Sequence, residues 1–293
     1  GLLIAVIIGG RWVAESSLGH YLHLSPTTLV WAMIVYGFLA AVLPVWVLLT
    51  PRDYLSTFMK VGTITILALG IIIVRPLVEM AAVTEFAFNT DGPVFAGTLF
   101  PFLFITIACG ALSGMHAMVS SGTSPKMVEK ETQVRMIGYG GMLMESFVAI
   151  MALAAAVSLS PGIYFSMNTS TATMEKLAGP EIVDAQPCNT NNDPEHHCEK
   201  LAEAAVAKLG VTDAQGRKLN PEWDSWDDQG NPKTYTGAEA LERLAGDVGE
   251  PNVVSRTGGA PTLSVGIAHI LHQIGGGRAM MGFWYHFAIM FEA

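Results

Sequence analysis

Residues 99–126, which read LFPFLFITIACGALSGMHAMVSSGTSPK, decide the fold class of this chain. The stretch is apolar and long enough to cross a bilayer, which takes about 20 residues of helix. Toward its end it carries glycine, serine and histidine, which a helix surrounded only by lipid does not need. Glycines let a second backbone approach, and hydroxyl or imidazole groups can hydrogen-bond a solute that has left water. The stretch therefore predicts a solute pathway, with the candidate substrate- or ion-binding residues Gly110, Ser113, Gly114, His116, Ser120 and Ser121.

The composition agrees with an all-α polytopic membrane protein. Hydrophobic residues make up 51% of the chain and charged residues 14%, and the mean hydropathy is +0.42. Chains of this kind alternate apolar runs with charged loops. The chain starts without Met inside one apolar run and stops inside another, which predicts an internal piece of a longer protein. Four central spans are expected, at Thr28–Leu49, Val61–Met80, Val94–Ser121 and Ile137–Leu159.

We expect three parts along the chain. Residues 1–160 form transmembrane helices, and residues 161–257 form an acidic block with a small mixed fold. Residues 258–293 contain Pro261–Ile274, which is short, bounded by glycines and expected to be re-entrant, and the truncated span Ala279–Ala293. Interrupted apolar segments of this kind are typical of binding sites in secondary transporters.

The short loops predict the orientation. Residues 50–60 and 122–136 carry Lys and Arg, whereas residues 82–93 carry only acidic charge. Because basic loops stay cytoplasmic, the acidic block should lie outside. It contains 16 Asp and Glu against 8 Lys and Arg, so nearly all of the net charge of −9 belongs to it. This acidity gives no reason to expect a nucleic-acid partner.

Local patterns within the acidic block predict a folded lid. Apolar residues at helical spacing indicate a helix over Glu199–Leu209, and Thr236–Glu239 reads as a capping box that opens a second helix through Leu244. The acidic run around Asp227 lacks calcium-loop spacing and is expected to be solvated surface. No hydrolytic chemistry is indicated.

Two cysteines fall in the same block. Cys188 and Cys198 are expected to pair in a disulfide, as an oxidising compartment would allow. The alternative is a zinc site that adds His196 and His197, although adjacent ligands suit tetrahedral coordination poorly. The disulfide is favoured, and no metal is predicted.

Ionisable residues inside the predicted spans have two interpretations each. Glu145 would cost about 2.5–3.5 kcal/mol unpaired near the bilayer centre, so it is either a proton-binding carboxylate or a hydrogen-bonded link between helices. His116 is either a binding residue or a satisfied packing residue. Arg75 and Glu79, four apart on one expected helical face, form either a structural ion pair or a gate.

Five segments closely resemble bacterial carbon starvation protein A, a family of peptide and pyruvate transporters. They are PVWVLLTPRDYLSTFMKVGT (44–63), LFPFLFITIACGALSGMHAMVSSGTSPKM (99–127), IGYGGMLMESFVAIMAL (137–153), GGAPTLSVGIAHIL (258–271) and FWYHFAIMFEA (283–293). The resemblance covers nearly the whole chain outside 168–250, where the cysteine loop and the Trp-rich acidic stretch look unlike the common family pattern.

The resemblance implies a multi-pass transporter of the bacterial inner membrane, distantly related to the LeuT-like inverted-repeat carriers, with residues 161–257 on the periplasmic side. It implies uptake of small peptides or pyruvate by proton symport, with no cofactor. One alternative is a sensing or binding subunit that uses the acidic block as a receptor. A membrane-embedded enzyme would need Ser113 or Ser120 with His116 as base, but serines in membrane helices usually bond backbone.

Overall fold

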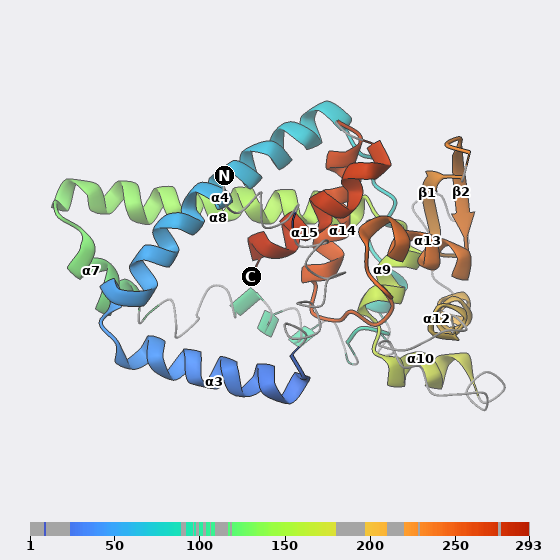
Figure 1. Ribbon diagram of the computed structural model, residues 1–293, viewed down its shortest axis with the longest axis horizontal. Coiled ribbons are helices and arrows are strands. Elements are labelled where there is room, and N and C mark those ends of the chain that lie inside the picture. Colours follow the sequence, from blue (N-terminus) through green and yellow to red (C-terminus); the bar gives the residue numbers. More distant parts are fainter. Residues whose placement is uncertain are drawn as a thin grey trace. The chain divides into compact units, whose positions relative to one another are not determined.

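The structure is a computed structural model that describes residues 9, 24–88, 92–95, 97, 100–101, 104–105, 107–108, 117, 119–179, 197–209, 220–227, 229–274 and 277–292. These residues are mostly helical, and they include one antiparallel pair of strands (Figure 1). They divide into two compact units. The first unit comprises residues 1–74 and 267–293, and the second comprises residues 75–266.

Two long helices open the first unit. Helix α3, Pro26–Val42, starts at Ser25, whose Oγ accepts a hydrogen bond from the Thr28 amide at 3.2 Å. It ends before Pro44, because the residue preceding a proline is driven out of the helical region. Helix α4, Val45–Val74, follows directly and runs for 30 residues.

This arrangement corrects two predicted spans. The predicted loop at residues 50–60 is helical, and the chain breaks at Leu43–Pro44, inside the expected span Thr28–Leu49. A 30-residue helix is about 45 Å long, whereas the apolar core of a bilayer is about 30 Å thick. The charged turns of α4 can therefore extend beyond the apolar layer without leaving the helix, which a reading based on hydropathy alone does not detect.

The apolar helices keep their apolar side chains on the outside. Segments Ser56–Val74 and Glu131–Val157 are long and apolar enough to cross a membrane, and Thr27–Val42 is shorter. Met33 in α3 is 70% exposed and Met136 is 81% exposed. The core helix of a soluble protein would bury such residues, so these surfaces fit a lipid environment.

The first unit also contains the end of helix α14, Ala260–His272, the 3₁₀ turn Gly277–Met280 and helix α15, Met281–Glu292. Helix α15 packs against α4. At Gly70 of α4 an added Cβ would lie 3.0 Å from the Leu271 side chain, so the glycine lets the two helices approach closely. The predicted apolar segment Pro261–Ile274 is thus a short helix of 13 residues.

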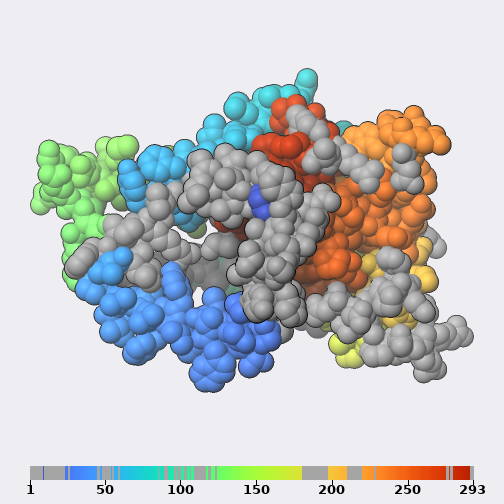
Figure 2. Space-filling view, viewed as in Figure 1, coloured from blue at the N-terminus to red at the C-terminus, as the bar shows by residue number. Residues whose placement is uncertain are grey.

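The second unit begins with an extended segment and contains helix α8, Glu131–Val157, which confirms a long apolar helix at the predicted span Ile137–Leu159, with an earlier start. The elements that follow α8 in this unit include α9 Pro161–Asn168, α10 Thr171–Ala178, α12 His197–Lys208, β1 Glu222–Trp226, β2 Pro232–Thr236 and α13 Ala238–Val248. The described part of the acidic block is therefore mixed α and β, as expected. In Figure 2 its hairpin and α13, coloured orange, form a closely packed surface.

The two predicted helices of the block are present, but the capping box is wrong. Thr236 is the last residue of β2, and α13 starts after Gly237, whose φ of 66° suits glycine. The first amide of the helix, at Ala238, instead donates to Glu203 Oε2 of α12 at 3.1 Å. Glu239, the expected capping partner, forms an ion pair with Lys233 at 3.3 Å. Because Thr236 is paired in strand β2, it does not cap α13, and the carboxylate that accepts from the first amide of α13 belongs to α12.

A hydrophobic core joins these elements. Leu201 of α12 and Leu241 and Leu244 of α13 are fully buried, and Trp223 faces Tyr235 across the hairpin. Each fully buried leucine contributes about 1.5–3 kcal/mol relative to an exposed one. The block therefore has a core of its own to hold a surface site in place.

Candidate functional site

Most of the predicted pathway residues lie outside the described residues, namely Gly110, Ser113, Gly114 and His116. Ser120 and Ser121 are described, and they lie in a π-helical turn, Val119–Thr123, followed by the short helix α7, Ser124–Met127. Turns of this type are rare and occur often at functional sites. The predicted interruption at Cys109–Gly114 falls outside the described residues, and the π turn is an interruption further along.

Both serine hydroxyls in this turn bond their own helix. Ser121 Oγ donates to the Ala117 carbonyl at 2.7 Å, and Ser120 Oγ donates to the same carbonyl at 3.1 Å. Each oxygen keeps acceptor capacity, and both residues are exposed. Their predicted role in binding a solute or ion stays a prediction, with this geometry limiting them to accepting hydrogen bonds.

Glu145 lies near the middle of α8 and is exposed. No hydrogen bond or ion pair reaches its carboxylate from the part of the chain that the structure describes. Gly138 and Gly141, two turns and one turn earlier, lie on the same helical face, and among the described residues an added Cβ at either would meet nothing beyond the helix's own backbone within 4 Å. A carboxylate and an open strip of glycine therefore share one face of an apolar helix.

The helical premise for Arg75 and Glu79 is wrong. Helix α4 ends at Val74, because a residue that precedes a proline, here Arg75 before Pro76, is disfavoured in the helical region. Arg75 has a φ of 50°. The Glu79 amide donates to the Val157 carbonyl at 2.9 Å. Both side chains are within the described part of the chain, which contains no ion pair between them. Their role as a gate stays a prediction, and it would require a conformation in which the two side chains form an ion pair.

A buried polar cluster that the sequence did not predict joins α9 to the start of α14. Asn168 Nδ2 donates to Thr262 Oγ1 at 2.8 Å and to the Tyr164 carbonyl at 2.9 Å. Nearby backbone bonding connects the Ser255 amide to the Ser166 carbonyl at 3.0 Å. The partners are 94 residues apart, so no local pattern could indicate their contact. The cluster anchors the acidic block to the short apolar helix.

A close backbone approach supports this anchor. An added Cβ at Gly266 of α14 would lie 2.4 Å from the Ala155 carbonyl oxygen of α8. Only glycine allows this approach without a shift of backbone. In the sequence, SVGIAH reads only as part of an apolar run. In the structure its glycine, Gly266, determines how closely α14 packs against α8.

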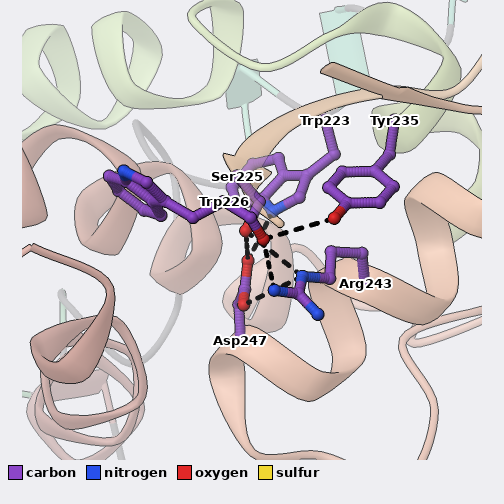
Figure 3. Close-up of polar contacts among 6 residues, drawn as sticks. All are labelled: Trp223, Ser225, Trp226, Tyr235, Arg243 and Asp247. Carbon is purple, nitrogen blue, oxygen red and sulfur yellow. Dashed lines mark hydrogen bonds and ion pairs between the residues drawn. The ribbon is translucent and has the colours of Figure 1, made fainter. Parts of the chain in front are cut away.

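A network of polar contacts joins the hairpin to α13 (Figure 3). Asp247 Oδ2 accepts hydrogen bonds from Trp223 Nε1, at 3.0 Å, and from the Ser225 hydroxyl, and Oδ1 lies 3.7 Å from Arg243 Nε. The Trp226 carbonyl accepts from Arg243 Nη2 and from the Tyr235 hydroxyl. Strand and helix are thereby fixed to each other beside an open cavity.

This cavity, of about 590 Å³, is the candidate binding site on the acidic block. Tyr235 lies beside it with two cations over its ring: Lys233 Nζ is 4.2 Å and Arg243 Cζ 5.4 Å from the ring centroid. Asp227 stays ionised at its edge, because hydrogen bonds from Asn231 and Gln229 hold the pKa of that carboxyl below its ordinary value. Among the described residues no group of three or more His, Cys, Asp and Glu could hold a metal ion.

The structure describes one of the two cysteines that are predicted to pair. Cys198, in the first turn of α12, is fully buried and disulfide-bonded. Its predicted partner Cys188 lies outside the described residues, so the pairing of these two stays a prediction. His197, next to it, has its Nε2 buried, which fits a packed interior.

Comparison with known proteins gives one consistent family. The model of the family described as carbon starvation protein CstA matches residues 1–218 and 224–293. The matched range includes most of 168–250, the cysteine loop among it, and is interrupted at residues 219–223, within the Trp-rich acidic stretch that the sequence sets apart. No solved structure matches the chain.

Three curated relatives are similar along the whole chain. The chain is 50% identical to "Peptide transporter CstA" of Escherichia coli K12, covering 98% of this chain and 35% of the relative. It is 49% identical to "Peptide transporter CstA" of Mycobacterium tuberculosis H37Rv, and the match covers 100% of this chain and 33% of the relative. It is 44% identical to "Pyruvate/proton symporter BtsT" of E. coli K12, and the match covers 100% of this chain and 37% of the relative. The chain thus spans about a third of the length of these relatives.

Proposed function

This chain belongs to the carbon starvation protein CstA family, and on that premise we propose that it is part of a secondary active transporter that imports small peptides, pyruvate or both by proton symport. The observation that carries the proposal is the identity of 44–50% to relatives named as a peptide transporter and a pyruvate/proton symporter. The exposed apolar surfaces of α3, α4 and α8 support a place in the bilayer.

We place the protein in the bacterial inner membrane, with residues 161–257 on the periplasmic side and a LeuT-like inverted repeat as its architecture. The short helix α14, bounded by glycines and packed at Gly266, is the kind of segment that forms sites in such carriers. The π turn at Val119–Thr123 is a second interruption. These features support a pathway assembled from broken helices.

Glu145 is our candidate for coupling. An ionisable group within a membrane helix is costly and commonly marks an ion or proton path. Protonated, it would cross a dry interior as a neutral acid, and release would follow when one side opened to water. Proton movement would then accompany the conformational change.

The test is accumulation by the full-length protein in proteoliposomes under an imposed proton gradient. Labelled pyruvate and a labelled dipeptide are offered separately, and a protonophore serves as the control. We expect uphill accumulation of at least one substrate, abolished by the protonophore. Equilibration without accumulation, or no uptake of either compound, would refute proton symport by this protein.

The cavity on the acidic block favours one second candidate, a sensing or binding subunit. Such a protein would bind its ligand at the block with no gradient-driven accumulation. The proteoliposome assay separates the two, because binding without accumulation identifies the second.

A further inference from the structure

The hairpin of the acidic block has two strands, β1 and β2, so each strand pairs along one edge and leaves the other edge to its surroundings (Figure 1). At one end of the hairpin the Gly237 amide donates to the Pro221 carbonyl at 2.8 Å. At the other end the Asp227 amide donates to the Asn231 carbonyl at 2.8 Å. Both pairs continue the register of the strands. Because bonded and non-bonded pairs alternate in an antiparallel ladder, these two bonds fix the direction of every backbone group between them.

The alternation divides the backbone groups of β2 into two sets. Lys233 and Tyr235 belong to bonded pairs and direct their N–H and C=O groups to β1. Thr234 and Thr236 belong to non-bonded pairs, so their N–H and C=O groups point to the outer edge. Pro232, which has no N–H, also occupies an outward position, where a strand tolerates proline.

The outer edge of β1 is covered by the protein, whereas that of β2 is not. On β1 the Glu222 amide donates to Ser160 Oγ at 3.3 Å. The Trp226 carbonyl accepts from Arg243 of α13. On β2 both threonines are exposed, and no residue that the structure describes bonds their outward N–H or C=O groups. Strand β2 therefore presents an open edge.

The chemistry of this edge selects its ligand. Outward donors and acceptors recur at Thr234 and Thr236, about 7 Å apart, which is the two-residue repeat of an extended chain. The main chain of an extended peptide has the same repeat and can add to such an edge as a further strand. A pyruvate-like anion has no N–H to donate to the outward carbonyls and lacks the repeat.

A second copy of the hairpin would offer the same backbone groups, but its charge opposes pairing. Residues 160–258 contain 16 Asp and Glu against 8 Lys and Arg, so two copies of the block repel each other. A peptide with a free amine at one end is attracted by the same excess of negative charge. Charge therefore favours a peptide over a second acidic block as the occupant of the edge.

We propose that the open edge of β2 binds short peptides in an extended conformation, as a third strand, and does not bind pyruvate. This rests on the proposed function, which offers peptides and pyruvate as substrates, and it assigns peptides to the acidic block. Because main-chain bonds do not depend on side chains, the edge accepts peptides of varied sequence. It favours peptides long enough to pair with both threonines, and it collects them before they reach the membrane pathway.

The test measures binding of labelled tetra-alanine to the full-length protein in detergent. The comparison probes are pyruvate and a tetra-alanine in which every peptide nitrogen is methylated, so that no amide can donate. The variant Thr234→Pro removes one outward N–H and keeps the bonds to β1. Thr234→Ala keeps that N–H and removes only the hydroxyl that bonds Asp224, so the ratio between the two variants isolates the amide.

We expect Thr234→Pro to bind tetra-alanine about two- to tenfold more weakly than Thr234→Ala does, which is the effect of one main-chain hydrogen bond. Hydrogen exchange followed by mass spectrometry locates the binding. Tetra-alanine should slow exchange in fragments that cover β2 of the wild-type protein. Pyruvate and the methylated peptide should leave exchange at β2 unchanged.

Equal binding of tetra-alanine by the two variants would overturn the proposal. Protection of every amide of β2 in the peptide-free protein would also overturn it, because another segment or a second copy would then cover the edge. If Thr234→Pro does not fold, exchange in the wild-type protein decides alone, and no slowing by tetra-alanine refutes the proposal.

Failure of the proposed function has a different result. In that case tetra-alanine slows exchange at β2, but proteoliposomes of the same protein accumulate neither a peptide nor pyruvate. Uphill accumulation of a peptide with no change of exchange at β2 removes only the edge site and leaves the transporter in place.

Discussion

Replacing Asp247 with alanine tests whether one buried carboxylate holds the hairpin on α13. Its side chain is 2% exposed and accepts from Trp223 Nε1 and the Ser225 hydroxyl while facing Arg243. Alanine would leave the indole N–H and the hydroxyl buried without this acceptor. Arg243 would keep its contacts with the Trp226 carbonyl, the Ser225 hydroxyl and the Tyr235 ring.

The size of the effect follows from these contacts. A hydrogen bond to a charged group contributes about 1.5–3 kcal/mol, and removal of one partner of a buried ion pair costs about 3–5 kcal/mol. The separation of Arg243 Nε from Asp247 is long, at 3.7 Å, and Arg243 retains other acceptors, so the lower end applies. We expect the free energy of local opening to fall by about 3 kcal/mol, which is about a hundredfold in the opening equilibrium.

Hydrogen exchange followed by mass spectrometry on the full-length protein measures this opening. Peptides that cover β1 and α13 should exchange about a hundredfold faster in Asp247→Ala, while peptides of α8 should not change. The matched control is Asp224→Ala, because Asp224 is exposed and, among the described residues, accepts a hydrogen bond from the Thr234 hydroxyl alone. If the two variants exchange alike, the carboxylate does not hold the hairpin and the argument fails.

Three further predictions concern coupling, packing and pH. Glu145→Gln should abolish gradient-driven accumulation while substrate exchange survives, and full uphill transport by this variant would demote Glu145 to a structural residue. Gly266→Ala should lower the stability of the solubilised full-length protein by about 1–3 kcal/mol in thermal unfolding, because the new Cβ meets the Ala155 carbonyl, whereas Gly246→Ala, with open space around it, should not. The folded-state pKa of Asp227 lies below its ordinary 3.8, so its stabilising effect is present above that pH and is lost as pH falls through the folded value. Exchange protection of the hairpin should follow that loss, and Asp227→Asn should remove the pH dependence.

The apolar runs predicted the helices well, because burial in lipid or in a core depends on composition over a whole turn. Helix ends depend on single residues. Pro44 and Pro76 moved two predicted boundaries, and both prolines were visible in the sequence. The capping box failed for a different reason, since Thr236 pairs in a strand before it can cap a helix. Local patterns compete, and strand pairing prevailed here.

The candidate sites also differ in whether a local sequence pattern could indicate them. Glu145 and the serines at 120 and 121 could be predicted, because a polar group within an apolar run is conspicuous in sequence. The bond from Asn168 to Thr262 and the cavity beside Tyr235 could not, because they arise from elements distant in the chain. Charge alone indicated an acidic surface, but only the fold shows that some of its carboxylates surround a hollow.

The face of α8 that carries Glu145 limits what this residue can do. Gly138, Gly141 and Glu145 recur at intervals of three and four, so they line one side of the helix, and in the described part of the chain nothing beyond the helix's own backbone lies within 4 Å of where the glycine Cβ atoms would be. Small residues at this spacing let another helix approach within the membrane, and such a helix would also give the carboxylate a partner. A carboxylate facing lipid would gain stability on replacement by leucine, whereas one packed against a helix would lose its hydrogen bond. Lower thermal stability of Glu145→Leu than of Glu145→Gln in the full-length protein would therefore show that this face is covered, and the reverse order would show that it faces lipid.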